Sequence, residues 1–175
     1  RGGVSVCANL PYYITTPILL ALLDSRLPFE SITVMIQSEV ADRLVAAPGT
    51  SAYGSVTAYL GYFGVTHRLF EVTSDKFLPP PKVDSTVVRI DLYKQKPYVP
   101  RNEEIFFRTL RAAFGQRRKT LPNALSAGFG ELSKSELTEA VKSAGFAPDI
   151  RGERLSTEDF VHLSDIISDL VARNK

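Results

Sequence analysis

The stretch VSVCANLPY at residues 4–12 decides the fold class of this chain. Its first five residues, 4–8, are nearly all apolar and predict a short buried strand. Thr16 and Pro17 follow, and they suit the N-cap and the first position of a helix. Residues 9–12 are therefore expected on the turn between the carboxyl end of a strand and a helix, where open α/β sheets bind ligands.

The turn Asn9-Leu10-Pro11-Tyr12 combines groups that suit recognition of an exposed amino group. The Asn9 amide oxygen and a backbone carbonyl can both accept hydrogen bonds from an NH2 group. Pro11 stiffens the turn, and Tyr12 offers a ring on which a base can stack. The same residues are also compatible with an ordinary strand-to-helix turn that holds a buried tyrosine. Tyr13 is assigned to packing.

Residues 31–92 continue the alternation of strands and helices. The apolar run 31–37 predicts a central parallel strand that is covered on both faces. Helices are expected next, at 39–47 and 55–63, and then strands at 65–72 and 85–92. The proline-rich segment 77–82 between these last two strands cannot join a sheet ladder and predicts a stiff extended loop.

The pattern turns helical in the last part of the chain. We predict a sheet domain at 1–93, a linker at 94–102 and a small all-α domain at 103–175. Ser133 and Glu136 have the spacing of a capping box, and Ser156 is placed to cap a later helix. An apolar stripe on the first helix of this domain is formed by Phe106, Leu110, Ala113 and Phe114.

The positions of the charged residues along the sequence are more informative than the net charge. The net charge of +2 is too small to indicate a partner. Between residues 94 and 119, however, eight basic residues stand against two acidic ones, a local excess of six positive charges. Such a segment is typical of a phosphate-binding surface.

Several classes of protein are excluded by composition. The single cysteine, Cys7, cannot form an internal disulfide, and we interpret it as a small buried strand residue. His67 and His162 have no cysteine or carboxylate pair beside them in sequence, so neither a metal site nor a histidine-based triad is expected. Apolar runs are too short for a membrane span, and we expect a cytoplasmic protein with no membrane partner.

Three motifs, in order and spacing, resemble one enzyme family. They are the turn 9–12, the segment FLPPPKVDS at 77–85 and the segment AFGQRRKT at 113–120, with QSEVADRL at 37–44 in addition. Together they look like the bacterial small-subunit (16S) rRNA adenine dimethyltransferases, the kasugamycin-resistance enzymes. The resemblance implies the C-terminal half of a Rossmann-like class I methyltransferase sheet, followed by the small all-α domain.

The resemblance also implies an activity and roles for residues. Family members use S-adenosyl-L-methionine to dimethylate N6 of two adjacent adenines near the 3′ end of small-subunit rRNA, in the immature small ribosomal subunit. The turn that includes Pro11 would be catalytic: Asn9 and the Leu10 carbonyl would accept the N6 hydrogens, and Asn9 would also contact the cofactor. Tyr12 and Phe77 would stack on the flipped adenine. The residues implied in RNA binding are Gln116, Arg117, Arg118 and Lys119.

One feature of the family is absent from the sequence. No G-x-G-x-x-G turn follows a strand, and Gly2-Gly3 is interpreted as the remnant of a connecting loop. We therefore expect a fragment that is inactive alone, with most of the cofactor site in a preceding segment. The complete protein is expected to be a monomer, whereas the fragment could self-associate through its exposed sheet edge.

Two other functions stay open. The first is a large-subunit rRNA adenine methyltransferase of the macrolide-resistance type, which shares an Asn-x-Pro-aromatic motif. The second is a non-enzymatic module that binds RNA during ribosome assembly.

Overall fold

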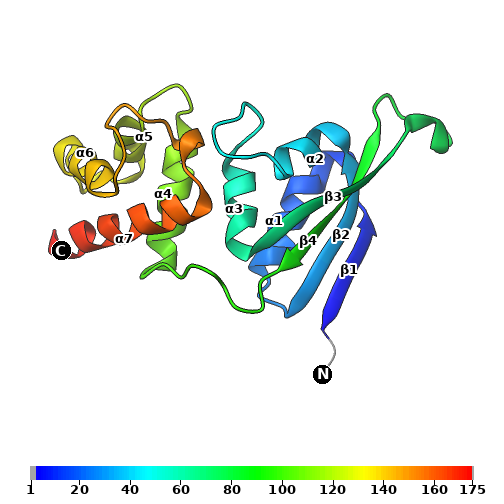
Figure 1. The fold of residues 1–175 in the computed structure, drawn as a ribbon, viewed down its shortest axis with the longest axis horizontal. Helices are drawn as coiled ribbons and strands as arrows, with labels where there is room; N and C mark the ends of the chain where they lie inside the picture. The colour runs from blue at the N-terminus through cyan, green and yellow to red at the C-terminus, as the bar shows by residue number, and fades with distance from the viewer. Residues whose placement is uncertain (1–2, 175) are drawn as a thin grey trace. The chain divides into compact units, whose positions relative to one another are not determined.

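The computed structural model describes residues 3–174, which divide into two compact units (Figure 1). The sheet unit holds the described residues up to Ala46 and also Leu60–Lys96. The helical unit holds Ala47–Tyr59 and the described chain from Pro97 onward. Gly2, part of the suggested loop remnant, lies outside the described residues. The mixture of strands and helices confirms the predicted α/β class.

The sheet unit is built on four strands in the order β1-β2-β4-β3. β1 (Val4–Asn9) runs parallel to β2 (Phe29–Gln37), whereas β4 (Ser85–Leu92) is antiparallel to both β2 and β3 (Gly64–Val72). The predicted strand–loop–strand ending is thus confirmed. The helices of this part are α1 (Thr15–Asp24) and α2 (Ser38–Leu44), and α3 (Ser55–Phe63) crosses the division between the units.

The core of the sheet unit lies along the two middle strands. Ile32 pairs with Ile90, and Val34 pairs with Val88; all four side chains are buried. α2 packs against β2, β3 and β4. Each large aliphatic side chain removed from water in this way contributes about 1.5–3 kcal/mol to folding.

The two parallel strands are less covered than their apolar sequences predict. β1 was expected to be buried, but no residue in it is fully buried, and Cys7 is exposed. The reason is its place at the edge of the sheet, where it pairs with β2 alone. β2 is central, as predicted, but its alternate residues Thr33 and Met35 are only half-buried, so one of its two faces is incompletely covered.

The start of α1 also differs from the prediction. Thr16 is not the N-cap: the helix begins at Thr15, two residues before the expected Pro17, directly after the 3-10 turn η1 (Tyr12–Ile14), and Ile14 stands at the cap position. The Thr15 hydroxyl instead donates to the Pro11 carbonyl, 3.2 Å away. This bond ties the helix to the turn that precedes it.

The helical unit packs four helices around aromatic and leucine side chains. They are α4 (Glu103–Gly115), α5 (Leu121–Gly128), α6 (Lys134–Ser143) and α7 (Thr157–Arg173). The fully buried side chains of this core include Phe106, Leu110, Leu121, Leu125, Phe129, Leu137 and Phe160. Phe114 of the predicted stripe is only half-buried; its ring centroid lies 5.7 Å from that of Phe160.

Capping boxes begin the last two helices; the first box and the Ser156 cap were predicted from the sequence, whereas the part that Asp159 plays in the second box was not. Ser133 and Glu136 bond reciprocally at α6, as do Ser156 and Asp159 at α7. Hydrogen bonds from the Ser133 hydroxyl and backbone, together with Asn174, lower the pKa of Glu136. Each box satisfies backbone N–H groups that have no partner inside the helix.

The segment Ala47–Tyr59 belongs to the helical unit because its polar groups bond there. The buried Tyr53 hydroxyl donates to the Leu155 carbonyl at 2.8 Å, and the Gly49 N–H donates to the Glu153 carbonyl at 2.8 Å. Burial, and secondarily the charge of Asp159, raises the pKa of Tyr53 well above its usual range. Sequence patterning had suggested no such association.

Within residues 3–174 no helix combines the length and apolar character needed to cross a membrane. No three His, Cys, Asp or Glu side chains of the described chain come together in a way that could hold a metal ion. His67 instead lies 3.5 Å from a carboxylate oxygen of Asp91, and His162 is exposed.

Removing the cap of α7 should destabilise the helical unit. Ser156→Ala deletes the acceptor for the Asp159 N–H, and we expect the free energy of unfolding to fall by about 1 kcal/mol. Ser135→Ala, at an exposed position of α6, is the control and should leave stability unchanged. Urea unfolding followed by far-UV circular dichroism measures both; equal stability of the two variants would contradict the capping role.

Candidate functional site

The strand order brings two distant segments to one end of the sheet. Asn9 at the end of β1 pairs with Met35, and Met35 pairs in turn with Val87 of β4. Because β4 runs antiparallel to β2, its first residue, Ser85, lies at the same end as the last residue of β1. The turn 9–12 and the loop 77–84 therefore meet there.

These two segments line a hollow of about 390 Å³. Four consecutive residues of the turn contribute, Asn9 to Tyr12, together with Phe77 from the loop. The structure thus brings together the five residues that the sequence singled out for a base-binding site. Sequence reasoning missed three further lining residues, which come from the proline-rich loop: Leu78, Pro79 and Pro81.

Backbone and side-chain bonds hold the turn in place. The Leu10 N–H donates to the Met35 carbonyl at 3.2 Å, and the Leu10 side chain is buried. The Tyr12 hydroxyl lies 2.7 Å from the hydroxyl of Ser85, which is fully buried at the start of β4. Ser85 therefore orients the Tyr12 ring, a role that no pattern in the sequence indicated.

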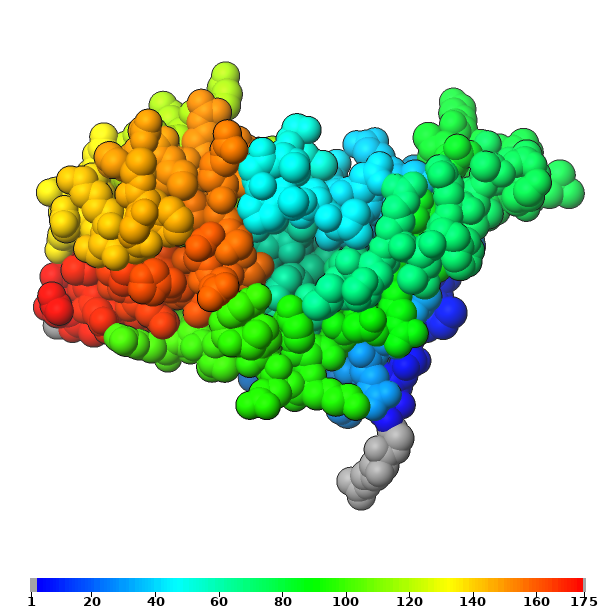
Figure 2. Space-filling model, viewed as in Figure 1, coloured from blue at the N-terminus to red at the C-terminus, as the bar shows by residue number. Residues whose placement is uncertain are grey.

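The proline-rich loop is fixed at its two ends. The Ser74 N–H donates to the Asp84 carboxylate at 2.8 Å, while the Asp84 carbonyl accepts from the Ser38 N–H at 3.0 Å. Hydrogen bonds from Lys76, and then from Thr73, lower the pKa of Asp75 in the turn η2 (Ser74–Lys76). Between these anchor points the segment protrudes from the surface of the sheet unit (Figures 1 and 2).

The hollow is electrically neutral. Apart from the Tyr12 phenol, its lining contains only an amide, three aliphatic or aromatic side chains and three prolines, with no acidic or basic group. The exposed Asn9 amide makes no hydrogen bond to another residue of 3–174, so it is available to a ligand. Such a lining suits a flat, uncharged ring that carries an amino group.

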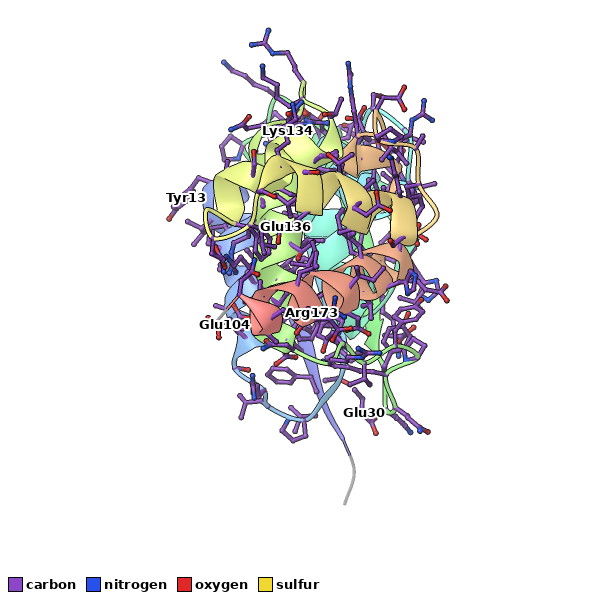
Figure 3. All side chains as sticks on the ribbon, turned by 90° about the vertical axis from the view of Figure 1, so that its left-hand side faces the viewer. Tyr13, Glu30, Glu104, Lys134, Glu136 and Arg173 are labelled. Carbon is purple, nitrogen blue, oxygen red and sulfur yellow. The ribbon has the colours of Figure 1, made fainter. Side chains whose placement is uncertain are left out.

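Tyr13 does not pack, contrary to the prediction. It follows Tyr12 in the turn η1, but its side chain is 85% exposed and points outward (Figure 3). Adjacent residues of a helical turn do not face the same way, and here only Tyr12 turns toward the sheet.

The second predicted site, Gln116 to Lys119, forms an exposed turn directly after α4. Its members differ in their surroundings. Arg117 lies 3.9 Å from the Glu153 carboxylate and 3.5 Å from the Ser51 carbonyl. Gln116, Arg118 and Lys119 have no side-chain partner among the described residues, so their polar groups face water.

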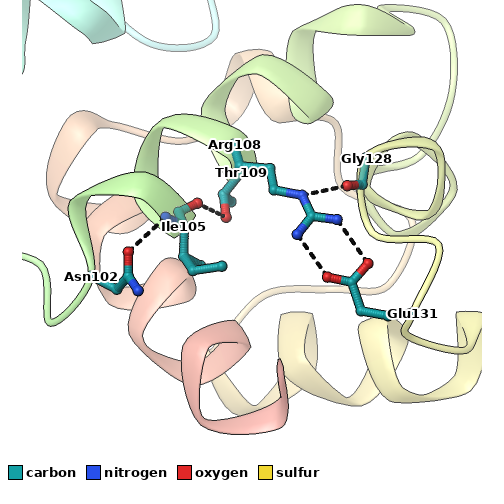
Figure 4. A network of polar contacts seen from close by, with 6 residues as sticks. All are labelled: Asn102, Ile105, Arg108, Thr109, Gly128 and Glu131. Atoms are coloured by element: carbon teal, nitrogen blue, oxygen red, sulfur yellow. Dashed lines mark hydrogen bonds and ion pairs between the residues drawn. The ribbon is translucent and has the colours of Figure 1, made fainter. Parts of the chain in front are cut away.

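Other basic residues of the segment 94–119 have structural partners. Arg101 pairs with Asp169 at 2.8 Å, and Arg108 forms a two-pronged pair with Glu131 at 2.7 Å (Figure 4). The Lys96 ammonium lies over the Tyr62 ring, 3.6 Å from its centroid. The charge available to a ligand is therefore smaller than the sequence count indicates and is concentrated near the end of α4.

The Tyr12–Ser85 bond can be tested by deleting one hydroxyl. Tyr12→Phe leaves the Ser85 hydroxyl without its partner, and we expect it to reduce the free energy of unfolding by about 0.5–1.5 kcal/mol. Tyr13→Phe removes the same group from an exposed neighbouring ring and should have no effect. Chemical denaturation of the two variants beside the parent chain makes the comparison; a loss of stability in both would argue against the bond.

The family model and two relatives that match this chain all carry names of ribosomal RNA methyltransferases or dimethylases. Residues 3–169 match the family model described as ribosomal RNA adenine dimethylase. A protein of Clostridioides difficile named ribosomal RNA small subunit methyltransferase A is 46% identical over 98% of this chain. A protein of the same name from Streptococcus thermophilus is 46% identical over 94%. The chain spans only 59% and 57% of the lengths of these two relatives.

Solved structures share the fold. A dimethyladenosine transferase from Plasmodium falciparum superimposes with a TM-score of 0.79 at 24% identity, covering 93% of this chain and 66% of the other. The 23S rRNA methyltransferase ErmE gives a TM-score of 0.69 at 19% identity, with 95% and 66% covered. The predicted methyltransferase-type fold is confirmed by both likenesses.

Proposed function

Because the chain belongs to the ribosomal RNA adenine dimethylase family, we propose that it provides the target-base site of an S-adenosylmethionine-dependent rRNA adenine-N6 dimethyltransferase. The substrate would be two adjacent adenines near the 3′ end of small-subunit rRNA, in the immature subunit in the cytoplasm. One observation carries the proposal: the neutral hollow that joins the turn 9–12 to Phe77.

The hollow accounts for recognition of adenine. The Asn9 Oδ1 and the Leu10 carbonyl would accept the two N6 hydrogens, while Tyr12 and Phe77 would contact the two faces of the ring. Extruding a base from its stack costs a few kcal/mol, and stacking on an aromatic side chain returns about 1–3 kcal/mol. The Tyr12–Ser85 bond holds the Tyr12 ring in one orientation before the base binds. Less conformational entropy of this side chain is therefore lost on binding.

The same acceptors explain how N6 becomes a nucleophile. Its lone pair is delocalised into the purine ring, and two acceptors in tetrahedral geometry favour the form in which the pair is localised. This is positioning and electrostatic preorganisation, with no general base. The N6 proton can pass to water once the nitrogen is alkylated, which agrees with a lining that holds no carboxylate.

The residues of this hollow would form only part of a binding site for the cofactor. S-adenosylmethionine, when bound, supplies a methyl group on a positively charged sulfur. Of the residues in this site we assign Asn9 to it, because the uncommitted Asn9 amide can also bond a polar group of the cofactor. We propose that most of the cofactor site belongs to the part of the relatives' length that this chain does not span, that this chain is inactive alone, and that the complete protein acts as a monomer.

Methylation assays test the proposal directly. We expect this chain to cosediment with unmethylated small ribosomal subunits but to transfer no labelled methyl group to the rRNA. Activity should appear in a chimera that joins the chain to the portion of the Clostridioides difficile relative that it does not span. Methyl transfer by the chain alone would refute the assignment of the cofactor site.

In that chimera, Asn9→Ala should reduce kcat by about 10²–10³, because a preorganised acceptor is lost, without weakening binding to subunits. Asn9→Asp keeps an acceptor and should retain more activity than the alanine variant. Tyr13→Ala, on the exposed neighbour, is the control and should remain active. Full activity of Asn9→Ala would eliminate the proposed acceptor.

The turn 116–119 supports small-subunit RNA over the large-subunit alternative, because its resemblance is to the small-subunit enzymes. The shared fold does not decide between them. Methylation by the chimera of naked large-subunit RNA, with none on immature small subunits, would reverse the choice. Binding of subunits without methylation by the chimera would favour the non-enzymatic assembly module.

Phosphate contact by this turn has a distinct signature. Lys119→Ala should weaken RNA binding and reduce the slope of log K against log salt concentration by about one unit. Lys134→Ala removes an equal charge from the start of α6 and should leave the slope unchanged (Figure 3). Fluorescence anisotropy titrations at several salt concentrations give both slopes, and identical slopes would remove Lys119 from the interface.

A further inference from the structure

A second hollow lies within the helical unit, between the end of α4 and the end of α5. Its volume is about 330 Å³. Small residues line it from both helices: Ala112 and Gly115 from α4, and Ala127 and Gly128 from α5. Neither the proposed catalytic turn nor the proline-rich loop takes part.

Close helix packing creates this hollow. A Cβ atom on Gly128 would come within 2.5 Å of the Ala112 Cβ, so the two helices approach at a distance that only glycine permits. A Cβ atom on Gly115, in contrast, would meet nothing within 4 Å, because it would project into open space. The floor is therefore backbone and methyl groups, with room above it.

One wall is made rigid by Arg108. Its Nε donates to the Gly128 carbonyl at 2.6 Å, and its two terminal nitrogens pair with Glu131 at 2.7 Å (Figure 4). The guanidinium also lies over the Phe129 ring, 4.3 Å from its centroid. These contacts balance the Arg108 charge and hold α4 and α5 together, so the hollow exists before any ligand binds.

The rim carries polar groups that are not used internally. Arg111 and Gln116 both line the hollow, both are exposed, and neither has a side-chain partner among residues 3–174. Arg111 can bind a phosphate. Gln116 offers a donor and an acceptor at one point, which is what the edge of a nucleobase requires.

We propose that this hollow binds one unpaired RNA base, with the base on the small-residue floor, its polar edge at Gln116 and its adjoining phosphate at Arg111. The inference rests on the proposed function only in taking RNA as the partner. A floor without charge suits a flat ring, and the two cations Arg118 and Lys119, which have no side-chain partner among residues 3–174, follow Gln116 in the same exposed turn. The target-base site is a different hollow in the sheet unit.

Filling the hollow tests the proposal on this chain itself. Gly115→Leu places a side chain in the open space, whereas Gly130→Leu adds the same side chain at another exposed glycine with nothing within 4 Å of its Cβ. Neither glycine has a positive φ, so neither variant is strained in its backbone. The probes are a short fluorescein-labelled single-stranded RNA and an abasic ribose-phosphate strand of equal length.

We expect Gly115→Leu to weaken binding of the RNA roughly fivefold or more and to leave binding of the abasic strand unchanged. Gly130→Leu should bind both strands as the parent chain does. Arg111→Ala should weaken both, because it removes a phosphate contact. Gly115→Ala, which adds one methyl group, provides a milder step if the leucine variant does not fold, and it should give a smaller loss for the RNA alone.

Two results would overturn the inference. Equal affinities of the Gly115 and Gly130 variants for the RNA would exclude the hollow while leaving the proposed methyltransferase function intact. Failure of the parent chain to bind either strand would exclude it too, and would also count against RNA contact by the turn 116–119. Methylation by the chimera is read separately, so failure of this inference and failure of the proposed function can be told apart.

Discussion

The candidate site depends on one constraint, the mixed pairing of β2. This strand runs parallel to β1 on one side and antiparallel to β4 on the other. The carboxyl end of β1 and the amino end of β4 must then lie at the same end of the sheet. Tyr12 and Ser85 meet there although they are 73 positions apart in the sequence. Every contact between the turn 9–12 and the loop before β4 follows from this arrangement.

Two hydrogen bonds from side-chain hydroxyl groups fix the turn 9–12 in one conformation beside the loop. The bond between Tyr12 and buried Ser85 fixes the aromatic ring, and the bond from Thr15 to the Pro11 carbonyl fixes the turn against α1. Both are short-range polar contacts in partly buried surroundings, where leaving either partner unpaired is costly. The hollow that results has a rigid, uncharged lining, and its recognition capacity comes from the Asn9 amide and ring faces.

In the helical unit the same basic segment serves both structure and binding. Arg101 and Arg108 are neutralised by carboxylates from later in the chain, Asp169 of α7 and Glu131 of the turn after α5, and these pairs hold α4 in place. Of the basic residues in α4 and the turn after it, Arg111, Arg118 and Lys119 have no acidic partner among the described residues. Structural pairing thus concentrates the available charge beside the small-residue hollow, where a phosphate backbone and one of its bases could be bound together.

The sequence by itself determined the features that depend on neighbouring residues: the bounds of β4, the capping box at Ser133, the cap at Ser156, and the motifs that lead to the family. It also singled out five of the eight residues that line the first hollow, namely Asn9 to Tyr12 and Phe77. Only the tertiary structure decided the exposure of Cys7 and Tyr13, the partner of Tyr12, and the association of Ala47–Tyr59 with the helices. These depend on which strand lies at an edge and which distant group meets a side chain, and local patterns carry no information about either.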